Sequence, residues 1–448
     1  MLKIFNLHQG HKRYLSNTSW LVAERILRLG LVLFVGIFVA RYLGPSKFGL
    51  LNYAQSFVAL FTTVATLGLE GILVRELVNQ SDREGELLGT AFILNLFGTM
   101  LMFVLIAIAI LISSDDTYAN ILIWIIAVPV VLHAFNVIDY SFQSKVQSKF
   151  VVFIHTFQIL VSSLIKIALI LFEAPLIAFA LISFIDAIAI GAGLIWIYHR
   201  QSNSVFNWKW NGNLAKQLLK DAWPLMLSGM VISIYMRIDQ VMIKEMLDNE
   251  AVGNYAAAVK LSTAWYFVPV AISTSVFSAI VNGKKLGEQV YLSRIQKLFD
   301  FMVWIAVAIA VPTTFLSEWV ISILFGENYL PAANVLKIHI WAGIFVFLGV
   351  SSSKWLLSEN LTLFSFYRTF VGAVCNIILN YFLIGPYGIE GAAYSTLISQ
   401  FIASVLVYAA TPKTRKIFFM QLQSVALVFA FRHLKPLYRN WVAAKKSP

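Results

Sequence analysis

The sequence carries little charge for its size. Only 12% of its 448 residues are charged, whereas a soluble domain has about 25%. At the same time, 59% of the residues are hydrophobic and 14% are aromatic. A globular core with a polar surface cannot enclose so many apolar side chains. The composition therefore excludes an ordinary soluble domain and predicts a protein whose outer surface faces lipid.

The sequence also lacks the residue patterns of catalytic and cofactor sites. Its single cysteine, Cys375, lies in an apolar run, which excludes an intrachain disulfide and favours a packing role. There is no Walker A sequence, no glycine-rich dinucleotide motif and no pair of Cys or His residues at zinc spacing. His133 and His155 stand singly and are predicted to be hydrogen-bonded core residues. We therefore expect no cofactor, no bound metal and no enzymatic activity.

Long apolar runs recur along the chain, the clearest being 87–114, 117–138, 261–282 and 391–412. A membrane-spanning helix needs about 20 apolar residues. The pattern predicts an all-α integral membrane protein with about twelve transmembrane helices. Because Met1–Tyr14 is polar and basic, we expect the first helix to be retained rather than cleaved as a signal peptide. The expected spans are 16–40, 48–70, 88–112, 118–138, 150–172, 175–198, 221–243, 252–281, 298–317, 331–353, 361–384 and 388–411.

Basic residues outside these spans fall almost entirely in alternate loops. The opposite loops hold only Arg41, Lys47 and Lys244. Lys and Arg accumulate in cytoplasmic loops of membrane proteins. We therefore expect both termini in the cytoplasm, and we attribute the net charge of +12 to topology rather than to nucleic-acid binding.

The longest polar connection divides the chain into two halves. We expect an N-terminal lobe at 1–200, a cytoplasmic linker at 201–220, a C-terminal lobe at 221–411 and a basic cytoplasmic or interfacial tail at 412–448. Phe48-Gly49 opens the second span and Val252-Gly253 opens the eighth, which is consistent with an internal repeat of six helices. Chance similarity between apolar helices is the alternative.

Several charged residues lie deep inside the expected spans, where they are unfavourable unless they have a function or a partner. The bases outnumber the acids, which favours a cationic, water-filled cavity for an anionic substrate. Arginine suits phosphate because its planar fork binds two oxygens at once. The alternative is a set of structural ion pairs. Lys337 and Arg368 lie nearer helix ends, and we expect them to extend to the membrane surface. The candidate substrate-binding residues are Arg25, Arg28, Lys166, Arg237 and Lys260, and the candidate ion-coupling residues are Glu24, Asp186 and Asp239.

Three segments carry a family resemblance. The run Ala40–Ala54, ARYLGPSKFGLLNYA, resembles the first outer loop and second helix of bacterial polysaccharide flippases. Leu67–Ile72 and Val74–Leu77 match the segment that follows in that family. The chain thus resembles a Wzx-type O-antigen flippase of the multidrug/oligosaccharidyl-lipid/polysaccharide exporter superfamily. The motif-level likeness covers about residues 14–79, and the layout of twelve spans extends it over the whole chain.

This resemblance implies two six-helix lobes around a central cavity in the bacterial inner membrane. It implies that an undecaprenyl-pyrophosphate-linked oligosaccharide is moved to the periplasmic leaflet by alternating access. The expected partners are this lipid-linked oligosaccharide and membrane lipids, with a proton or sodium as candidate coupling ion and other polysaccharide assembly proteins as further candidates. The chain lacks the two further C-terminal helices of lipid II flippases, which argues against that substrate. A multidrug extrusion antiporter, a membrane polysaccharide polymerase or ligase, and a membrane scaffold are the alternatives.

Overall fold

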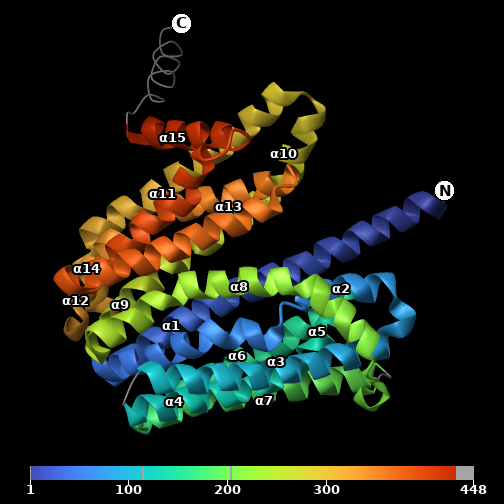
Figure 1. The fold of residues 1–448 in the computed structure, drawn as a ribbon, viewed down its shortest axis with the longest axis horizontal. Helices are drawn as coiled ribbons and strands as arrows, with labels where there is room; N and C mark the ends of the chain where they lie inside the picture. Colours follow the sequence, from blue (N-terminus) through green and yellow to red (C-terminus); the bar gives the residue numbers. More distant parts are fainter. Residues whose placement is uncertain (1, 114–115, 202–203, 430–448) are drawn as a thin grey trace, which may run out of the picture. The chain divides into compact units, whose positions relative to one another are not determined.

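The computed structural model describes residues 2–113, 116–201 and 204–429, and it leaves the side chains of 2–26, 113, 278 and 427–429 undescribed. All regular secondary structure in these ranges is helical. The chain forms two compact units, Met1–Gly253 and Asn254–Pro448. In each unit the long helices lie side by side (Figure 1), which confirms the predicted all-α class.

The first unit contains α1 (Leu2–Thr66), α2 (Glu70–Asn79), η1 (Ser81–Arg83), α3 (Glu84–Ser113), α4 (Thr117–Ala127), η2 (Val128–Asn136), α5 (Val137–Ser144), α6 (Lys149–Leu171), α7 (Leu176–Arg200), η3 (Val205–Asn207), α8 (Gly212–Met246) and the start of α9 (Asn249–Thr263). The second unit contains the rest of α9, η4 (Ala264–Tyr266), α10 (Phe267–Lys285), α11 (Glu288–Phe325), η5 (Glu327–Tyr329), α12 (Pro331–His339), α13 (Ala342–Ser358), α14 (Thr362–Ser404), η6 (Leu406–Ala409) and α15 (Arg415–Phe429).

Twelve membrane crossings follow from the helix lengths. The described residues contain 10 helical segments that are long and apolar enough to cross a membrane. Two of them, Leu27–Asn79 with 53 residues and Thr362–Ala409 with 48 residues, are long enough for two crossings each. Each is interrupted by a glycine with non-helical backbone angles, Gly44 in α1 and Gly388 in α14. The predicted separations at 40–48 and 384–388 fall at these two glycines.

Other expected spans contain breaks within the membrane-spanning length. Leu67 and Gly68 both have positive φ angles and separate α1 from α2, because a residue in the left-handed region ends a helix. A nine-residue 3₁₀ segment, η2, follows α4 and has Pro129 near its start. The short segment η4 separates α9 from α10. The second, fourth and eighth crossings are therefore discontinuous helices.

Loops that are predicted to share one side of the membrane lie together in the first unit. Lys145 of the fourth loop forms a 2.8 Å ion pair with Glu84 of the second loop. The backbone amide of Lys209, in the sixth loop, donates to the carbonyl of Gly85. The ends of these helices are thus joined by charged and backbone contacts, as the alternation of basic residues predicts.

The opposite loops of the first unit are also joined to one another. The Tyr42 hydroxyl, near the first loop, donates a 2.9 Å hydrogen bond to the carbonyl of Ala174 in the fifth loop. Lys244, at the end of α8, lies 3.5 Å from the carboxylate of Asp116 in the third loop. Each predicted set of loops therefore gathers at its own end of this unit.

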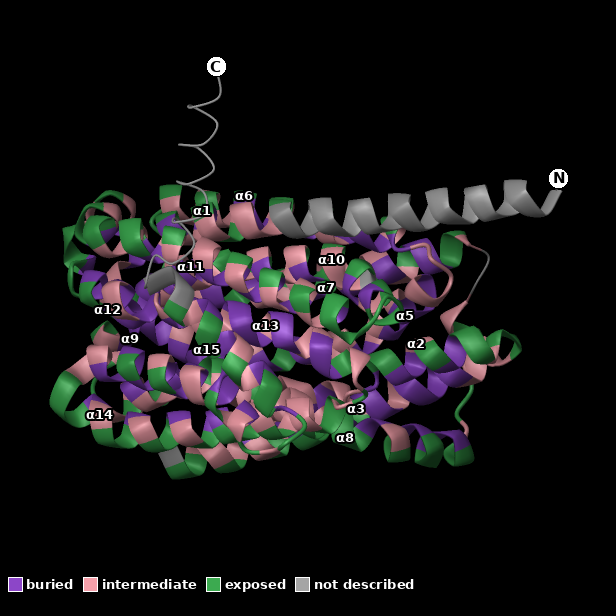
Figure 2. Ribbon diagram, turned by 90° about the horizontal axis from the view of Figure 1, so that it is seen from above, coloured by how far each residue is buried: buried purple, intermediate pink, exposed green. Residues whose placement is uncertain are grey.

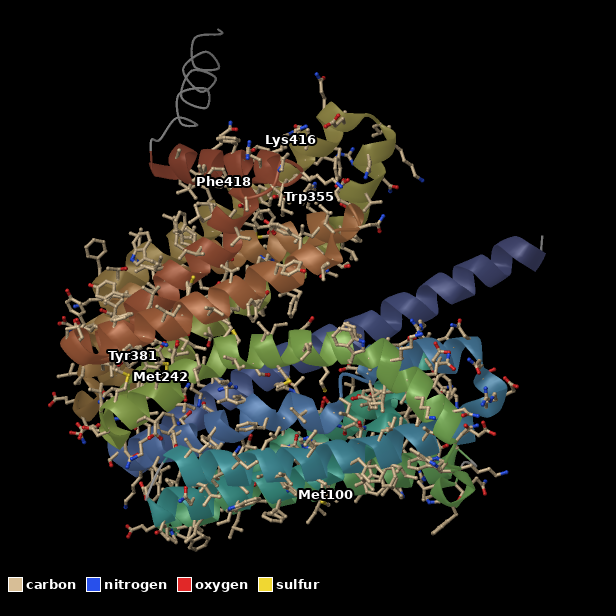
Figure 3. The ribbon with its side chains drawn as sticks, in the orientation of Figure 1. Met100, Met242, Trp355, Tyr381, Lys416 and Phe418 are labelled. Atoms are coloured by element: carbon tan, nitrogen blue, oxygen red, sulfur yellow. The ribbon has the colours of Figure 1, made fainter. Side chains whose placement is uncertain are left out.

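The same arrangement holds in the second unit for the eighth and tenth loops and the segment after the last span. Lys284 pairs with Glu359 at 3.0 Å, and Lys416 pairs with Glu288 at 2.6 Å. Lys416 lies on the exposed side of α15 (Figure 3), and Phe418, two residues further on, packs against a core cluster that includes Trp355. Residues 415–429 are thus a helix packed into the second unit, and residues 430–448 of the predicted tail lie outside the described residues.

Burial is distributed as expected for a protein surrounded by lipid. Exposed residues occur along the lengths of the helices and not only at their ends (Figure 2). Many of them are large and apolar, such as Phe34, Phe153 and Phe315, each more than 60% exposed. In water such surfaces would promote association, whereas lipid solvates them.

Candidate functional site

The seventh crossing, α8, combines low burial with low hydropathy. Only 17% of its most apolar stretch is buried, close to the 18% of Asn249–Lys285 and far below the 61% of Pro331–Ser358. It is also the least apolar of the 10 spans found in the described residues. A helix that faces lipid along its length should be strongly apolar. The combination of low burial and low hydropathy therefore favours contact with water or a polar ligand.

Arg237 lies on the exposed side of α8. Asp239, two residues further on, is buried with 7% of its surface exposed. Residues two apart on a helix point in different directions, and Arg237 makes no ion pair with any described residue, Asp239 included. Arg237 and Asp239 therefore do not neutralise one another in the structure, and Arg237 presents an uncompensated positive charge.

Polar contacts join α8 to the second half of α1. The Ser56 hydroxyl donates to the side-chain oxygen of Gln240 at 2.9 Å, and Thr63 and Ser233 are hydrogen-bonded at 3.1 Å. We call these contacts, together with a hydrogen bond from Tyr53 to Glu245, the α1–α8 polar seam. Sequence analysis missed the seam because serine, threonine and glutamine carry no charge signal.

Asp186 of α7 is held by two residues of α6. Gln158 donates a 2.6 Å hydrogen bond to one carboxylate oxygen, and the Ser162 hydroxyl donates to the other at 3.3 Å. Lys166, one turn further along α6, lies close enough to Asp186 for the two charges to attract one another. The structure thus brings together one candidate base and one candidate acid, and it adds two polar partners that the sequence did not indicate.

Three other candidates lie on α1. Arg28 is partly buried and takes part in a polar or electrostatic interaction within the structure. The side chains of Glu24 and Arg25 lie outside the described residues. The predicted pairing of Glu24 with Arg28 therefore stays a prediction.

The second unit holds the candidate Lys260, on α9, which is partly buried and also takes part in an interaction. Five residues before it, the Tyr255 hydroxyl lies 3.3 Å from the hydroxyl of Thr396 on α14. Asn376 and Asn380, also on α14, are fully buried and joined by a 3.3 Å hydrogen bond. These two uncharged hydrogen-bonded pairs were not identified from the sequence.

The two bases that we expected to extend to the surface behave differently from one another. Lys337 forms a 2.7 Å ion pair with Glu318 at one end of the second unit. Arg368 instead turns toward α13, where its Nη2 donates a 2.6 Å hydrogen bond to the Ser353 hydroxyl. The expectation that both side chains simply extend to the interface therefore needs correction for Arg368, because a hydroxyl on the neighbouring helix holds its guanidinium.

The chain matches a protein-family model described as polysaccharide biosynthesis protein over residues 14–282, which is more than half of its length. The chain belongs to this family. The match confirms the family indicated by the motifs at Ala40–Ala54 and Leu67–Leu77. A second family model, MatE, matches residues 224–382, so this family member also shares sequence features with that group in its C-terminal half.

Curated relatives of this family member are distant. The chain is 28% identical over 190 residues to "Probable flippase AglR" of Haloferax volcanii, covering 40% of this chain and 38% of the relative. It is 24% identical over 207 residues to "Capsular polysaccharide biosynthesis protein CapF" of Staphylococcus aureus, covering 44% and 51%. The alignments thus span about half or less of these relatives.

Among solved structures, the fold is similar to "Lipid II flippase MurJ, inward closed conformation", with a TM-score of 0.68 and 19% identity over 91% of each chain. This likeness concerns the fold. It agrees with a multi-pass membrane protein of two helical units.

Proposed function

We propose that the protein is a flippase that moves an undecaprenyl-pyrophosphate-linked oligosaccharide, such as an O-antigen unit, across the bacterial inner membrane. Family membership, the multi-pass helical fold and a relative named as a probable flippase support transport rather than catalysis. In this proposal both termini are cytoplasmic, and the lipid tail stays in the bilayer while the head group crosses.

The observation that carries the proposal is the exposed, uncompensated Arg237 on α8. A guanidinium within a membrane crossing is unfavourable unless water or an anion contacts it. A pyrophosphate supplies that anion and can accept two parallel hydrogen bonds from one arginine. Arg28, Lys166 and Lys260 are the further bases that we propose for the cationic route, with Arg25 as a candidate whose side chain is not described. Asp186 and Asp239 are the proposed sites for a coupling proton or sodium.

Complementation of a deletion strain tests the proposal. Lipid-linked oligosaccharide should accumulate without the gene, and mass spectrometry should identify an undecaprenyl pyrophosphate carrier. Expression of the wild-type protein should abolish this accumulation of lipid-linked oligosaccharide. Arg237→Gln should leave at least about tenfold more unflipped intermediate, because a hydrogen bond to a charged group contributes about 1.5–3 kcal/mol. Arg200→Gln is the matched control, since Arg200 stacks on Trp196 at the end of α7 and should behave as wild type.

A multidrug extruder is the second candidate, favoured by the MatE match at residues 224–382. That function predicts that the deletion strain becomes sensitive to cationic drugs while its lipid-linked sugars stay unchanged. Accumulation of the sugars without drug sensitivity would exclude it.

A further inference from the structure

Arg368 occupies an unusual position in the second unit. It lies six residues after Thr362 at the start of α14, so its Cα is about 9 Å along the helix. Its Nη2 donates to Ser353 of α13 at 2.6 Å. Its Nε is buried and has no hydrogen-bond partner in the described structure. An unpaired buried donor is unfavourable, so the fold leaves this guanidinium only partly satisfied.

A glycine on α13 makes room for the guanidinium. A Cβ at Gly349 would lie 3.2 Å from Nη1 of Arg368 and 2.5 Å from the Ser404 hydroxyl. The absence of a side chain at position 349 therefore lets the arginine lie against the backbone of α13. The buried hydroxyl of Tyr408 lies close enough to Arg368 to interact electrostatically with its charge. The surroundings thus contain hydroxyl groups and one cation.

The negative charges near this end of the unit are already engaged by other groups. Glu359 accepts hydrogen bonds from Lys284 and from Tyr291. Asp300 accepts them from Gln296 and Ser424. Arg368 makes no ion pair with any described residue, and a positive charge without a counterion is left at the edge of the span.

A second cation follows Ser353 directly in the sequence. Lys354 lies over the ring of Phe277 of α10, 5.6 Å from its centroid, and it forms no ion pair with the described residues. Near Arg368, α14 exposes Leu363, Tyr367 and Phe370, an apolar surface on which acyl chains can lie. A cationic group a short distance inside the span, next to an apolar surface, matches the amphipathic shape of a lipid.

We propose that Arg368, together with Ser353 and Lys354, binds the phosphate group of a membrane lipid. The guanidinium charge of Arg368 attracts the phosphate oxygens, Ser353 fixes the orientation of the fork, and Lys354, the next residue after Ser353, adds charge. Two sources have this chemistry, the headgroup of an anionic phospholipid and the pyrophosphate of a polyprenyl lipid. The proposal does not involve Arg237 and does not depend on the protein being a flippase.

Lipid retention by the purified full-length chain tests this site. The protein is reconstituted in phosphatidylcholine vesicles, in the same vesicles with phosphatidylglycerol, and in the same vesicles with undecaprenyl pyrophosphate. It is then extracted and its retained lipids are measured by native mass spectrometry. Wild type should retain one of the two anionic lipids in preference to phosphatidylcholine. Arg368→Gln should lower this retention about tenfold, and Arg368→Lys should lower it less.

Arg415→Gln is the control, because Arg415 is an exposed arginine of the same unit and its loss should leave retention unchanged. If Arg368→Gln loses retention of phosphatidylglycerol alone, the site binds phospholipid. If it loses retention of undecaprenyl pyrophosphate, the site binds the polyprenyl carrier. Equal retention by Arg368→Gln and wild type overturns the proposal. If Arg368→Gln does not fold, the wild-type measurement alone tests the proposal. Wild-type protein that retains neither anionic lipid in preference to phosphatidylcholine also overturns the proposal.

Discussion

The hydroxyl of Ser56 donates a 2.9 Å hydrogen bond to the side-chain oxygen of Gln240, and both residues are buried. This bond lies in the middle of the α1–α8 polar seam. These bonds attach α8 to α1 in the first unit. Arg237 lies three residues from Gln240 and four from Ser233, so its exposed side chain stands beside the seam.

We predict that Ser56→Ala destabilises the protein by about 1–3 kcal/mol, because Gln240 then keeps a buried oxygen without a donor. The double variant Ser56→Ala with Gln240→Leu should recover part of this loss, since neither polar group remains. A double-mutant cycle on thermal unfolding in detergent measures the coupling. Additive effects of the two substitutions would show that the bond does not contribute.

Close packing at Gly49 gives a second prediction. A Cβ at Gly49 would collide with the backbone carbonyl of Asn249, and one at Gly253 would collide with that of Pro45. Gly49→Ala should therefore reduce the amount of folded protein in the membrane, at a cost of at least about 1–3 kcal/mol. Gly71→Ala is the control, because a Cβ there meets nothing within 4 Å. Similar yields for both variants would contradict the tight α1–α9 contact.

A third prediction concerns Asp186. In Asp186→Asn, Gln158 and Ser162 keep polar partners, but Lys166 loses its nearby negative charge. If Asp186 couples transport to an ion, flipping should fall more than protein level does, and adding Lys166→Met should not restore it. If the charge pair is structural, Asp186→Asn with Lys166→Met should restore both. Surface polysaccharide and immunoblots of membranes, taken at several external pH values, separate the two roles.

A fourth prediction concerns α1. Arg25→Ala and Arg28→Ala should sharply reduce surface polysaccharide while the protein still reaches the membrane, because an arginine within a span is expected to meet water or an anion. Lysine should rescue partly, since it keeps the charge without the fork. Full activity of Glu24→Gln combined with Arg28→Gln would refute substrate binding by Arg28 and support a structural pair.

The topology gives a fifth prediction. Reporter fusions after Asp116 and Glu327 should lie in the periplasm, and fusions after Lys149 and Lys285 in the cytoplasm. The contacts Glu84–Lys145 and Asp116–Lys244 already place each set of loops of the first unit at its own end, so the reporters decide only which end faces which compartment. Two reversed reporters would contradict the twelve-span orientation.

Apolar run length and loop charge were sufficient to predict the helical membrane class, the number of crossings and the sharing of ends by alternate loops. These features depend on local composition, because a crossing needs a minimum number of apolar residues wherever it occurs. The family, too, was readable from the segment Ala40–Ala54. The division into an N-terminal lobe at 1–200 and a C-terminal lobe at 221–411 stays a prediction. The boundary between the two compact units falls after Gly253 in the chain.

Only the tertiary structure decided how the charged residues are used. The sequence places Arg237 two residues from Asp239 and Lys166 twenty residues from Asp186, yet only the distant pair interacts. Direction around a helix and packing of neighbouring helices determine this, and neither depends on distance along the chain. For the same reason the sequence could not show that Arg368 turns toward Ser353, because that contact requires Gly349 on another helix to leave the space empty.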